Sequence, residues 1–388
     1  MSVIETLNVS PEFEQRRIER ERTLWALFPE RLRELRERAN PIKQVYLSHP
    51  DEPCELRMRQ ITTSDGTRYE AALKGKTTYE NGMRVRDEPV PGVEISKETF
   101  DFYVNQDDLP AVYKLRFDFS PGVAVDFYED HTVIEIEDPI AGQAFFEQYP
   151  ETQFVDITGD HQTSNEWLAH INYRRTHDGH EALAPLPDLD TDKMVADILG
   201  ARMESLTPLI ITVGGRSGSG KSTIVRELRE KLAAMGLTSD VTSTDDYHRG
   251  KQRLEAHNGG RQWEDWDDEF VYKLDALQED LGRYRMGEVI PKLYMNFITQ
   301  EPEVAGIIRP VDVLIVEGIY ASSAEIAPFS SLHYEITTSL ATCAWQRAIR
   351  DEKERPLFTN LGGNLRYYLS NAEPAHRRQL KKRAAVGL

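Results

Sequence analysis

Cysteine is scarce in this sequence, and long apolar runs are missing from it. The two cysteines, Cys54 and Cys343, lie far apart and lack the close spacing typical of a metal site. No apolar stretch approaches the roughly 18 residues that a membrane-spanning helix needs. The N-terminal residues also lack the apolar core of a signal peptide. The sequence therefore predicts a cytoplasmic protein with no disulfides and no association with a membrane.

Positive charge is in deficit as well. The 388 residues carry a formal net charge of −18 at pH 7. This balance disfavours a general nucleic-acid-binding function, because such proteins normally present a basic face. Local basic clusters are present, however, and these can bind a small anionic ligand. The length favours two domains, since a single hydrophobic core rarely extends beyond about 250 residues.

The pattern of apolar residues changes along the chain. Short β-like runs separated by turn signals occupy residues 43–137 and predict an antiparallel barrel or sandwich. Residues 177–204 are predicted to be a linker, rich in Pro and Asp at its start, that ends in a helix. Beyond it, buried strands alternate with helices, which is typical of an α/β fold with a parallel sheet. We therefore expect one domain at residues 1–176 and another at residues 205–388.

The strongest local motif is a phosphate-binding loop. Residues 215–222 read G-R-S-G-S-G-K-S and match the pattern G-x-x-x-x-G-K-[ST], with an apolar strand before them and a helical period after them. Glycines let backbone N–H groups approach phosphate oxygens, Lys221 can reach the outer phosphates, and the Ser222 hydroxyl can bind Mg²⁺. The predicted nucleotide-binding residues are consecutive: Gly215, Arg216, Ser217, Gly218, Ser219, Gly220, Lys221, Ser222 and Thr223.

Three segments after the loop narrow the class of enzyme. They read VTSTDDYHRG (241–250), WEDWDDEF (263–270) and VDVLIVEGIYA (311–321). In this order they resemble the motifs of the uridine kinase/phosphoribulokinase family. The resemblance implies ATP as a substrate and Mg²⁺ as a cofactor, with the carboxylate of Glu317 close to the metal.

The same resemblance implies roles for single residues. The catalytic base falls on Asp245, with the adjacent Asp246 as an alternative. Tyr247, Trp266 and Asp267 fall on substrate-binding positions.

A later segment, CAWQRAIRDEKERP (343–356), is similar to the arginine-rich lid helix of the family. Arg347 and Arg350 would close over the transferred phosphate, with Arg355 one turn further on. A solvated helix with a charged surface is the alternative.

The likeness weakens where the family contacts its pyrimidine. The counterpart segment YMNFITQEP (294–302) has Asn296, Gln300 and Pro302 where Asp, His and Arg are usual, and Leu357 replaces a second lid arginine. The resemblance therefore favours phosphoryl transfer and leaves the acceptor open.

Charged residues two apart in sequence recur in the N-terminal half. Such a pair on a strand points to one face, and a single pair is typical of a solvent-facing strand. Several pairs together predict inward-facing charge in a closed barrel, which would form a wet tunnel for a polyanion. The pairs are Glu19/Glu21, Arg57/Arg59, Lys74/Lys76, Lys114/Arg116 and Glu135/Glu137.

The order of these pairs, together with Q-V-Y-L at 44–47, V-D-F at 125–127 and the tail at 154–169, is similar to that of the CYTH family, the triphosphate tunnel metalloenzymes. The resemblance covers about residues 15–172 and implies an antiparallel β-barrel tunnel. Mg²⁺ or Mn²⁺ would be held by Glu19, Glu21, Asp126, Glu135 and Glu137. Triphosphate would be held by Arg57, Arg59, Lys74, Lys76, Lys114 and Arg116.

One departure bears on the chemistry of the tunnel. Thr23 stands where the family has a lysine. Whether the tunnel hydrolyses its ligand or only binds it is therefore open.

Together the two resemblances imply an enzyme that handles phosphate in both halves. The C-terminal half would be an ATP-dependent kinase for a small, nucleoside-type acceptor. The N-terminal half would bind and hydrolyse tripolyphosphate, pyrophosphate or a nucleoside triphosphate. Two alternatives stay open: only one half is catalytic while the other senses nucleotide or polyphosphate, or the N-terminal half is an adenylate cyclase. The oligomeric state is also open, a homodimer included.

Overall fold

The computed structural model describes most of the chain. Among the described residues, no helix is both long enough and apolar enough to cross a membrane. The described residues are 17–150, 153–183, 189–205, 207–354 and 360–387.

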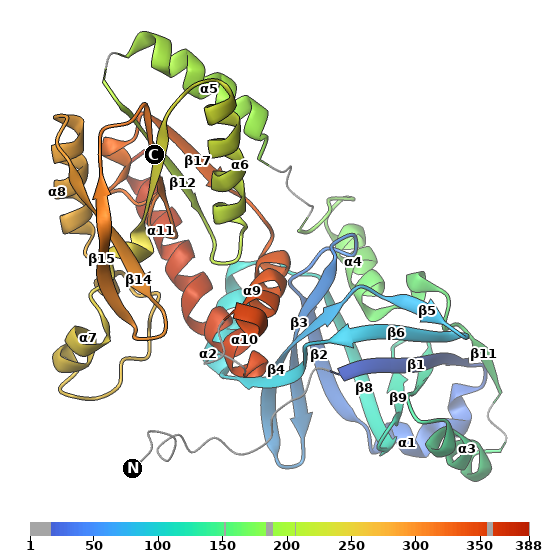
Figure 1. Cartoon of the computed structure of the whole chain (residues 1–388). Coiled ribbons are helices and arrows are strands. Elements are labelled where there is room, and N and C mark those ends of the chain that lie inside the picture. The colour runs from blue at the N-terminus through green and yellow to red at the C-terminus, as the bar shows by residue number, and fades with distance from the viewer. Residues whose placement is uncertain (1–16, 151–152, 184–188, 206, 355–359, 388) are drawn as a thin grey trace. The chain divides into compact units, whose positions relative to one another are not determined.

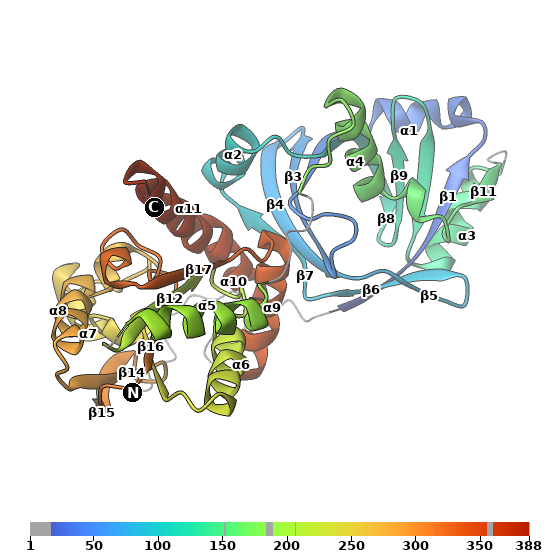
Figure 2. The same cartoon turned by 90° about the horizontal axis from the view of Figure 1, so that it is seen from above.

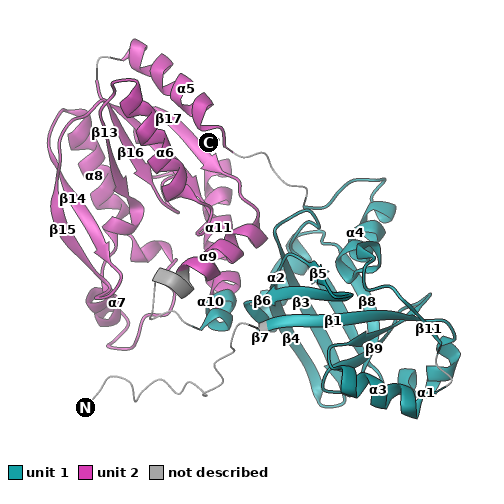
Figure 3. Ribbon diagram, turned by 45° about the vertical axis from the view of Figure 1, so that its right-hand side comes forward, with its two compact units in different colours: residues 1–185, 358–366 teal, residues 186–357, 367–388 magenta. Residues whose placement is uncertain are grey.

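Two compact units divide the chain (Figure 3). Unit 1 comprises residues 1–185 together with 358–366, and unit 2 comprises residues 186–357 together with 367–388. The first boundary lies inside the predicted linker. The short return of residues 358–366 to unit 1 has no counterpart in the sequence prediction.

Unit 1 is built on an antiparallel sheet of eleven strands, in the order β5-β6-β1-β10-β9-β8-β2-β3-β4-β7, with β11 paired to β1. Figure 2 shows that the sheet curves, so that β6 lies across from β8 and β9. The strands that the alternating runs predicted are all present. The strands are β1 (Arg17–Ala26), β2 (Asn40–Tyr46), β3 (Cys54–Thr63), β4 (Gly66–Gly75), β5 (Thr78–Glu80), β6 (Met83–Glu88), β7 (Val90–Ile95), β8 (Ala111–Ser120), β9 (Val123–Phe127), β10 (Thr132–Ile136) and β11 (Phe154–Asp156).

The prediction of a closed barrel is wrong, because the described strands form an open sheet. β6 pairs with β1, whereas β7 pairs with β4, and only Pro89 separates β6 from β7. Proline has no N–H to donate, so a hydrogen-bonded ladder is interrupted at this position. Side chains still cross the interruption, since Lys74 on β4 forms an ion pair with Glu19 on β1 at 2.9 Å.

The inner face of this sheet is charged, which reverses the usual polarity of a half-buried strand. On β1, the side chains of Glu19 and Glu21 are 6% and 2% exposed, whereas Ile18 is 57% exposed. An apolar core lies elsewhere in the unit, where Leu35 and Phe145 pack with residues of β9 and β10. The helices of the unit are α1 (Arg33–Glu37), α2 (Lys97–Gln106), α3 (Pro139–Gln148), α4 (Asn165–Thr176) and, at its edge, α10 (Leu361–Tyr367).

Unit 2 contains the predicted parallel sheet. Its four strands are hydrogen-bonded in the order β13-β16-β12-β17, and every pair is parallel. All residues of β12 are buried, because helices cover both faces of a sheet of this kind. The strands are β12 (Leu209–Gly215), β13 (Ser239–Ser243), β16 (Val313–Glu317) and β17 (Leu332–Ile336), and a separate hairpin is formed by β14 (Ile290–Asn296) and β15 (Glu301–Ile308).

Helices pack on both faces of this sheet (Figure 1). Val225 and Leu228 of α6 pack against one face, with residues of α5 beside them. Leu277 and Leu281 of α8 pack against the other face. The helices are α5 (Thr191–Glu204), α6 (Lys221–Ala234), α7 (Lys251–His257), α8 (Leu274–Arg285), α9 (Leu340–Glu354) and α11 (Glu373–Ala385), the last preceded by a π-helical turn at Tyr368–Ala372.

Candidate functional site

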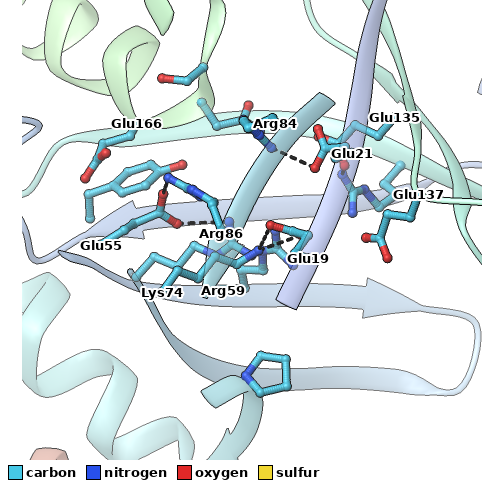
Figure 4. Close-up of a pocket in the computed structure, with 16 residues that line it drawn as sticks. Glu19, Glu21, Glu55, Arg59, Lys74, Arg84, Arg86, Glu135, Glu137 and Glu166 are labelled. Carbon is cyan, nitrogen blue, oxygen red and sulfur yellow. Dashed lines mark hydrogen bonds and ion pairs between the residues drawn. The ribbon is translucent and has the colours of Figure 1, made fainter. Parts of the chain in front are cut away.

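The inner face of unit 1 encloses a cavity of about 130 Å³, which we call the charged cavity. Six cationic and six carboxylic side chains line it, so it can bind metal and anion together. Figure 4 shows these side chains converging from several strands, with Glu166 and Glu137 at opposite ends of the view. The lining residues are Glu19, Glu21, Tyr46, Glu55, Arg57, Arg59, Lys74, Arg84, Arg86, Pro91, Arg116, Glu135, Glu137, Ser164, Asn165 and Glu166.

Three of the predicted metal ligands come together at one end of the charged cavity. Glu19 and Glu21 lie on β1, and Glu137 follows β10. One carboxylate oxygen from each lies within 4.8 Å of the others. Mg²⁺ and Mn²⁺ prefer oxygen ligands of this kind, so the donor set fits such an ion.

The carboxylates of this cluster differ in their ionisation. Burial opposes the charge on Glu19, but the charges of Lys74 and Arg84 outweigh it and lower the pKa of Glu19 to about 2. Burial raises the pKa of Glu21. The charge of Arg84 opposes this rise only in part, and the charge of Glu135 adds to the rise. A divalent cation would offset this crowding of negative charge.

The other two predicted metal ligands have cationic partners. Asp126 is fully buried and accepts hydrogen bonds from Lys114 at 2.5 Å and from Arg116 at 2.7 Å. Glu135 is held by Arg116, and despite burial this charge keeps the pKa of Glu135 well below its usual range. Asp126 and Lys114 do not line the charged cavity. Burial, and next the charge of Arg116, lowers the pKa of Lys114 to about 8.

Four of the six predicted phosphate-binding residues line the charged cavity: Arg57, Arg59, Lys74 and Arg116. Lys76 is exposed and lines a neighbouring cavity. The Nε atom of Arg57, a side chain only 7% exposed, is buried and has no hydrogen-bond partner among the described residues. A buried donor without a partner is costly, and a bound phosphate oxygen would supply the missing acceptor.

Sequence reasoning did not assign four charged side chains of the charged cavity: Glu55, Arg84, Arg86 and Glu166. Arg84 donates to Glu21 at 2.7 Å, and Arg86 donates to Glu55 at 2.7 Å. The alternation of Glu55 with Arg57 was a usable signal in the sequence. Glu166 lies on α4, where no strand periodicity points to it.

Thr23 is the residue at which the resemblance to the tunnel enzymes led us to expect a lysine. Its hydroxyl donates to Glu21 at 2.8 Å, and its side chain lines the neighbouring cavity. The residue therefore leaves a neutral contact with a predicted metal ligand where a lysine would add positive charge.

In unit 2, the phosphate-binding loop joins β12 to α6 as predicted. Lys221 begins α6, and its ammonium group donates to the carbonyls of Gly215 (3.0 Å) and Arg216 (2.7 Å). Burial lowers its pKa, and the charges of Glu317 and Asp245 oppose this effect. Ser222 and Thr223 are exposed at the start of the helix.

The loop is held closely by α9. Gly218 has φ of +83°, and a Cβ on it would lie 2.3 Å from the carbonyl oxygen of Cys343. Arg347 donates to the hydroxyl of Ser217 at 3.1 Å, so one predicted lid arginine faces the loop. Arg350 is half-buried on α9, whereas Arg355 and Leu357 lie outside the described residues.

Two other loop residues have structural partners. The guanidinium of Arg216 forms a two-pronged ion pair with Glu373, at 2.9 and 3.3 Å. Ser219 is buried, and its carbonyl accepts from Thr338 at 3.1 Å. These contacts fix the loop backbone, whose N–H groups are the expected phosphate ligands.

The adjacent aspartates have different surroundings. Asp246 accepts hydrogen bonds from the backbone N–H groups of Ser243 (3.1 Å) and Met295 (3.2 Å). Burial raises the pKa of Glu317, and the charge of Lys221 opposes the rise. Both aspartates add to the rise of the pKa of Glu317, Asp245 more than Asp246, and the charge of Asp245 also opposes the lowering of the pKa of Lys221.

The three predicted substrate residues are not equivalent. Tyr247 is buried, and its hydroxyl donates to Asp280 at 2.9 Å, which directs it into the core. The ring of Trp266 stacks on His248, with centroids 5.5 Å apart. Asp267 is 8% exposed, and its backbone N–H donates to the hydroxyl of Tyr367 at 3.0 Å.

The counterpart of the pyrimidine-binding element forms the turn between β14 and β15. At this turn the side chain of Ile298 is 83% exposed, and Gln300 has φ of +59°. The backbone N–H of Lys251 at the start of α7 donates to the carbonyl of Gln300 at 2.9 Å.

Comparisons with known proteins concern mainly this unit. Residues 210–359 match the model of the phosphoribulokinase/uridine kinase family. A uridine kinase from Staphylococcus haemolyticus (strain JCSC1435) is 29% identical over 171 residues, which cover 43% of this chain and 79% of that protein. The likeness to this kinase family therefore lies mainly in unit 2. Unit 1 up to residue 185 lies outside the family match.

Solved structures show partial likeness. A proposed fructose transport system kinase from Silicibacter sp. TM1040 is 16% identical, with 50% of this chain and 95% of that chain covered and a TM-score of 0.45. The Hippeastrum protein HpAC1, reported to have a dominant triphosphatase activity, is 12% identical, with 34% of this chain and 86% of that chain covered and a TM-score of 0.24.

Proposed function

We propose that unit 2 transfers the γ-phosphoryl group of ATP to a hydroxyl of a small, nucleoside-type acceptor. The observation that carries this proposal is the convergence of Lys221, Asp245 and Arg347 on the phosphate-binding loop. The match of residues 210–359 to the kinase family supports it.

Each of these residues would have its own role in the phosphoryl transfer. Lys221 would leave its loop carbonyls for the outer phosphates, and Arg347 would offset charge on the transferred group. Asp245 would accept the proton of the acceptor hydroxyl while the hydroxyl oxygen bonds to the γ-phosphorus and ADP departs. Ser222 and Glu317 would hold Mg²⁺, which supplies charge neutralisation at the phosphates.

A panel of acceptors tests this proposal. The purified full chain is incubated with ATP, Mg²⁺ and one compound at a time, either a nucleoside or a small sugar, and ADP formation is measured. We expect nucleosides to raise ADP formation at least about tenfold over the background with ATP alone. Lys221→Ala is the control, because it removes the phosphate-binding ammonium. ADP formation that no acceptor raises would contradict the proposal.

We propose a second activity for unit 1, because the charged cavity has a separate set of ligands. Glu19, Glu21 and Glu137 would hold Mg²⁺ or Mn²⁺, which would help to activate the attacking water. Arg57 and Lys74 would bind the oxygens of a phosphate chain. The reaction would be hydrolysis of the chain, with water bonding to a phosphorus atom and a phosphate group departing.

Tripolyphosphate and pyrophosphate are suitable probes of the charged cavity. We expect the full chain to bind tripolyphosphate in calorimetry with Mn²⁺ and to lose most of this affinity when the metal is chelated. Release of inorganic phosphate separates hydrolysis from binding alone. Binding without release would support a sensor, in keeping with Thr23. Equal tripolyphosphate affinity with and without the metal would contradict the metal site.

A further inference from the structure

Two adjacent tyrosines, Tyr367 and Tyr368, lie where α10 ends and the π-helical turn before α11 begins. The turn spans Tyr368–Ala372. Turns of this kind interrupt a helix and occur frequently at functional sites. Tyr368 is buried, Tyr367 is half-buried, and both residues belong to unit 2. Neither residue was assigned a role from the sequence.

The rings of both tyrosines lie against the guanidinium of Arg347 on α9. The Cζ atom of Arg347 is 5.6 Å from the ring centroid of Tyr367 and 5.4 Å from that of Tyr368. A guanidinium within about 6 Å of an aromatic centroid is attracted by the negative face of the ring. Arg347 also donates to the hydroxyl of Ser217 at 3.1 Å. The two rings therefore hold the guanidinium at the place where it meets the phosphate-binding loop.

The hydroxyl groups of the two tyrosines contact different parts of the proposed transfer site. The hydroxyl of Tyr368 donates to the carbonyl of Ser217 in the loop at 3.2 Å. The hydroxyl of Tyr367 accepts from the backbone N–H of Asp267, a predicted substrate-binding residue, at 3.0 Å. The carbonyl of Asp267 accepts from the hydroxyl of Tyr320 at 2.6 Å. Tyr367 therefore contacts the predicted acceptor segment with its hydroxyl and the arginine with its ring.

The charges around Tyr367 support the same arrangement. Burial, and next the charge of Asp267, raises the pKa of Tyr367, and the charge of Arg347 opposes the rise. The phenol is therefore neutral near neutral pH. A carboxylate beside Arg347 would hold the guanidinium more firmly but would neutralise its charge. Neutral rings hold the guanidinium and leave its charge available to a transferred phosphate.

We propose that Tyr367 is a positioning residue for phosphoryl transfer, whose ring holds Arg347 and whose hydroxyl fixes the acceptor-binding segment at Asp267. Tyr368 supplies the second ring. Tyr367 thereby sets the place of the transfer arginine relative to the bound acceptor, and phosphoryl transfer is sensitive to such placement. The inference rests on the proposed function of unit 2.

Two substitutions of Tyr367 separate its ring from its hydroxyl. ADP formation by the full chain is measured at saturating ATP with the nucleoside that gives the fastest reaction. Tyr367→Phe keeps the ring, so kcat should stay within about twofold of wild type. Its KM for the nucleoside should increase about threefold or more, because the N–H of Asp267 loses its acceptor. Tyr367→Leu also removes the ring, so kcat should decrease about tenfold.

A control substitution and a double variant complete the experiment. Tyr334→Leu replaces another half-buried tyrosine of unit 2, on β17, and should leave kcat and KM within about twofold of wild type. In the background of Arg347→Ala, Tyr367→Leu should lower kcat less than about twofold, because no guanidinium is left for the ring to hold. Should Tyr367→Leu fail to fold, Tyr367→Met takes its place in the comparison.

The outcomes are distinguishable. An equal loss of kcat from Tyr367→Leu in both backgrounds would overturn the inference, because Tyr367 would then act independently of Arg347. An unchanged kcat in Tyr367→Leu, or an unchanged KM in Tyr367→Phe, would overturn it as well. Absence of nucleoside-dependent ADP formation in the wild type would contradict the proposed function of unit 2 and this inference with it.

Discussion

The carboxyl group of Glu166 lines both the charged cavity and the neighbouring cavity of unit 1. Burial, and next the charge of Glu55, raises its pKa to about 8, from an ordinary 4.5. The hydroxyl of Ser48 donates to it at 2.8 Å, and this bond opposes the rise without cancelling it. A protonated Glu166 adds no negative charge to the charged cavity, which favours anion binding near neutral pH.

Glu166 should therefore make the folded chain less stable as pH rises. The folded state keeps this proton up to about pH 8, whereas the unfolded chain loses it near 4.5, so the folded state binds more protons in this window. The contribution of Glu166 to stability is complete below pH 4.5, the pKa in the unfolded chain, and is lost above about pH 8, the pKa in the folded chain. In Glu166→Gln no proton can be lost, so its melting temperature relative to wild type should increase from about pH 5 to about pH 9.

Thermal unfolding at a series of pH values measures this effect. Glu147→Gln, an exposed substitution on α3, is the control. Profiles of Glu166→Gln and wild type that run parallel across the window would contradict the assigned pKa shift.

The adjacent aspartates of unit 2 give a second prediction. Asp245→Asn should lower kcat for ADP formation about 100-fold or more, because it removes the proposed proton acceptor. Asp246→Asn should leave kcat largely intact and lower the free energy of unfolding by about 1 kcal/mol, because an amide oxygen replaces a carboxylate that accepts two backbone N–H groups. Steady-state kinetics and urea unfolding measure the two effects. A large loss of kcat in Asp246→Asn, with kcat largely intact in Asp245→Asn, would make Asp246 the base.

Helix α9 places an arginine against the phosphate-binding loop. Arg347 reaches the phosphate-binding loop from this helix, and the neighbouring Gln346 is exposed on it. Arg347→Ala should lower kcat about 10- to 100-fold with a change of about threefold or less in the dissociation constant of ATP, because its charge acts mainly in the transition state. Gln346→Ala is the control. A loss confined to ATP affinity would instead make Arg347 a ground-state ligand.

The end of β10 tests the metal site. Glu137 is exposed, so Glu137→Gln should leave the melting temperature of the metal-free chain unchanged. It should weaken Mn²⁺ binding about tenfold, because it removes one of three converging carboxylates. Glu94→Gln, an exposed glutamate on β7 of the same sheet, is the control. Calorimetry with Mn²⁺ measures the affinity, and equal affinities of the two variants would contradict the site.

Local pattern was sufficient to predict the strands of unit 1 and the phosphate-binding loop of unit 2. It was insufficient where side chains meet across strands, since cross-strand neighbours depend on register. The register of β1 with β6 places Glu21 opposite Arg84 and Glu19 opposite Arg86, and neither arginine was assigned a role from the sequence. The role of Asp246 depends on a backbone N–H of β14, which its own neighbours in sequence do not reveal.

For the whole molecule, the resemblance to tunnel enzymes predicted a barrel closed by hydrogen bonds, and the sheet is open. The interruption at Pro89 was visible in the sequence as the segment PVPG. Its effect was not predictable, because it depends on β6 and β7 pairing with different neighbours. The charged interior persists since side-chain ion pairs such as Lys74 with Glu19 cross the interruption.

The account of the whole molecule is that each unit handles phosphate at a site of its own. One experiment tests this directly: wild type, Lys221→Ala, Glu137→Gln and the double variant are compared for ATP-dependent phosphorylation of a nucleoside and for Mn²⁺-dependent tripolyphosphate binding. We expect Lys221→Ala to lower phosphorylation about 100-fold or more and to keep tripolyphosphate binding. We expect Glu137→Gln to weaken Mn²⁺-dependent tripolyphosphate binding and to keep phosphorylation. The double variant should combine both losses additively. A single substitution that removes both activities from a folded protein would contradict two independent sites.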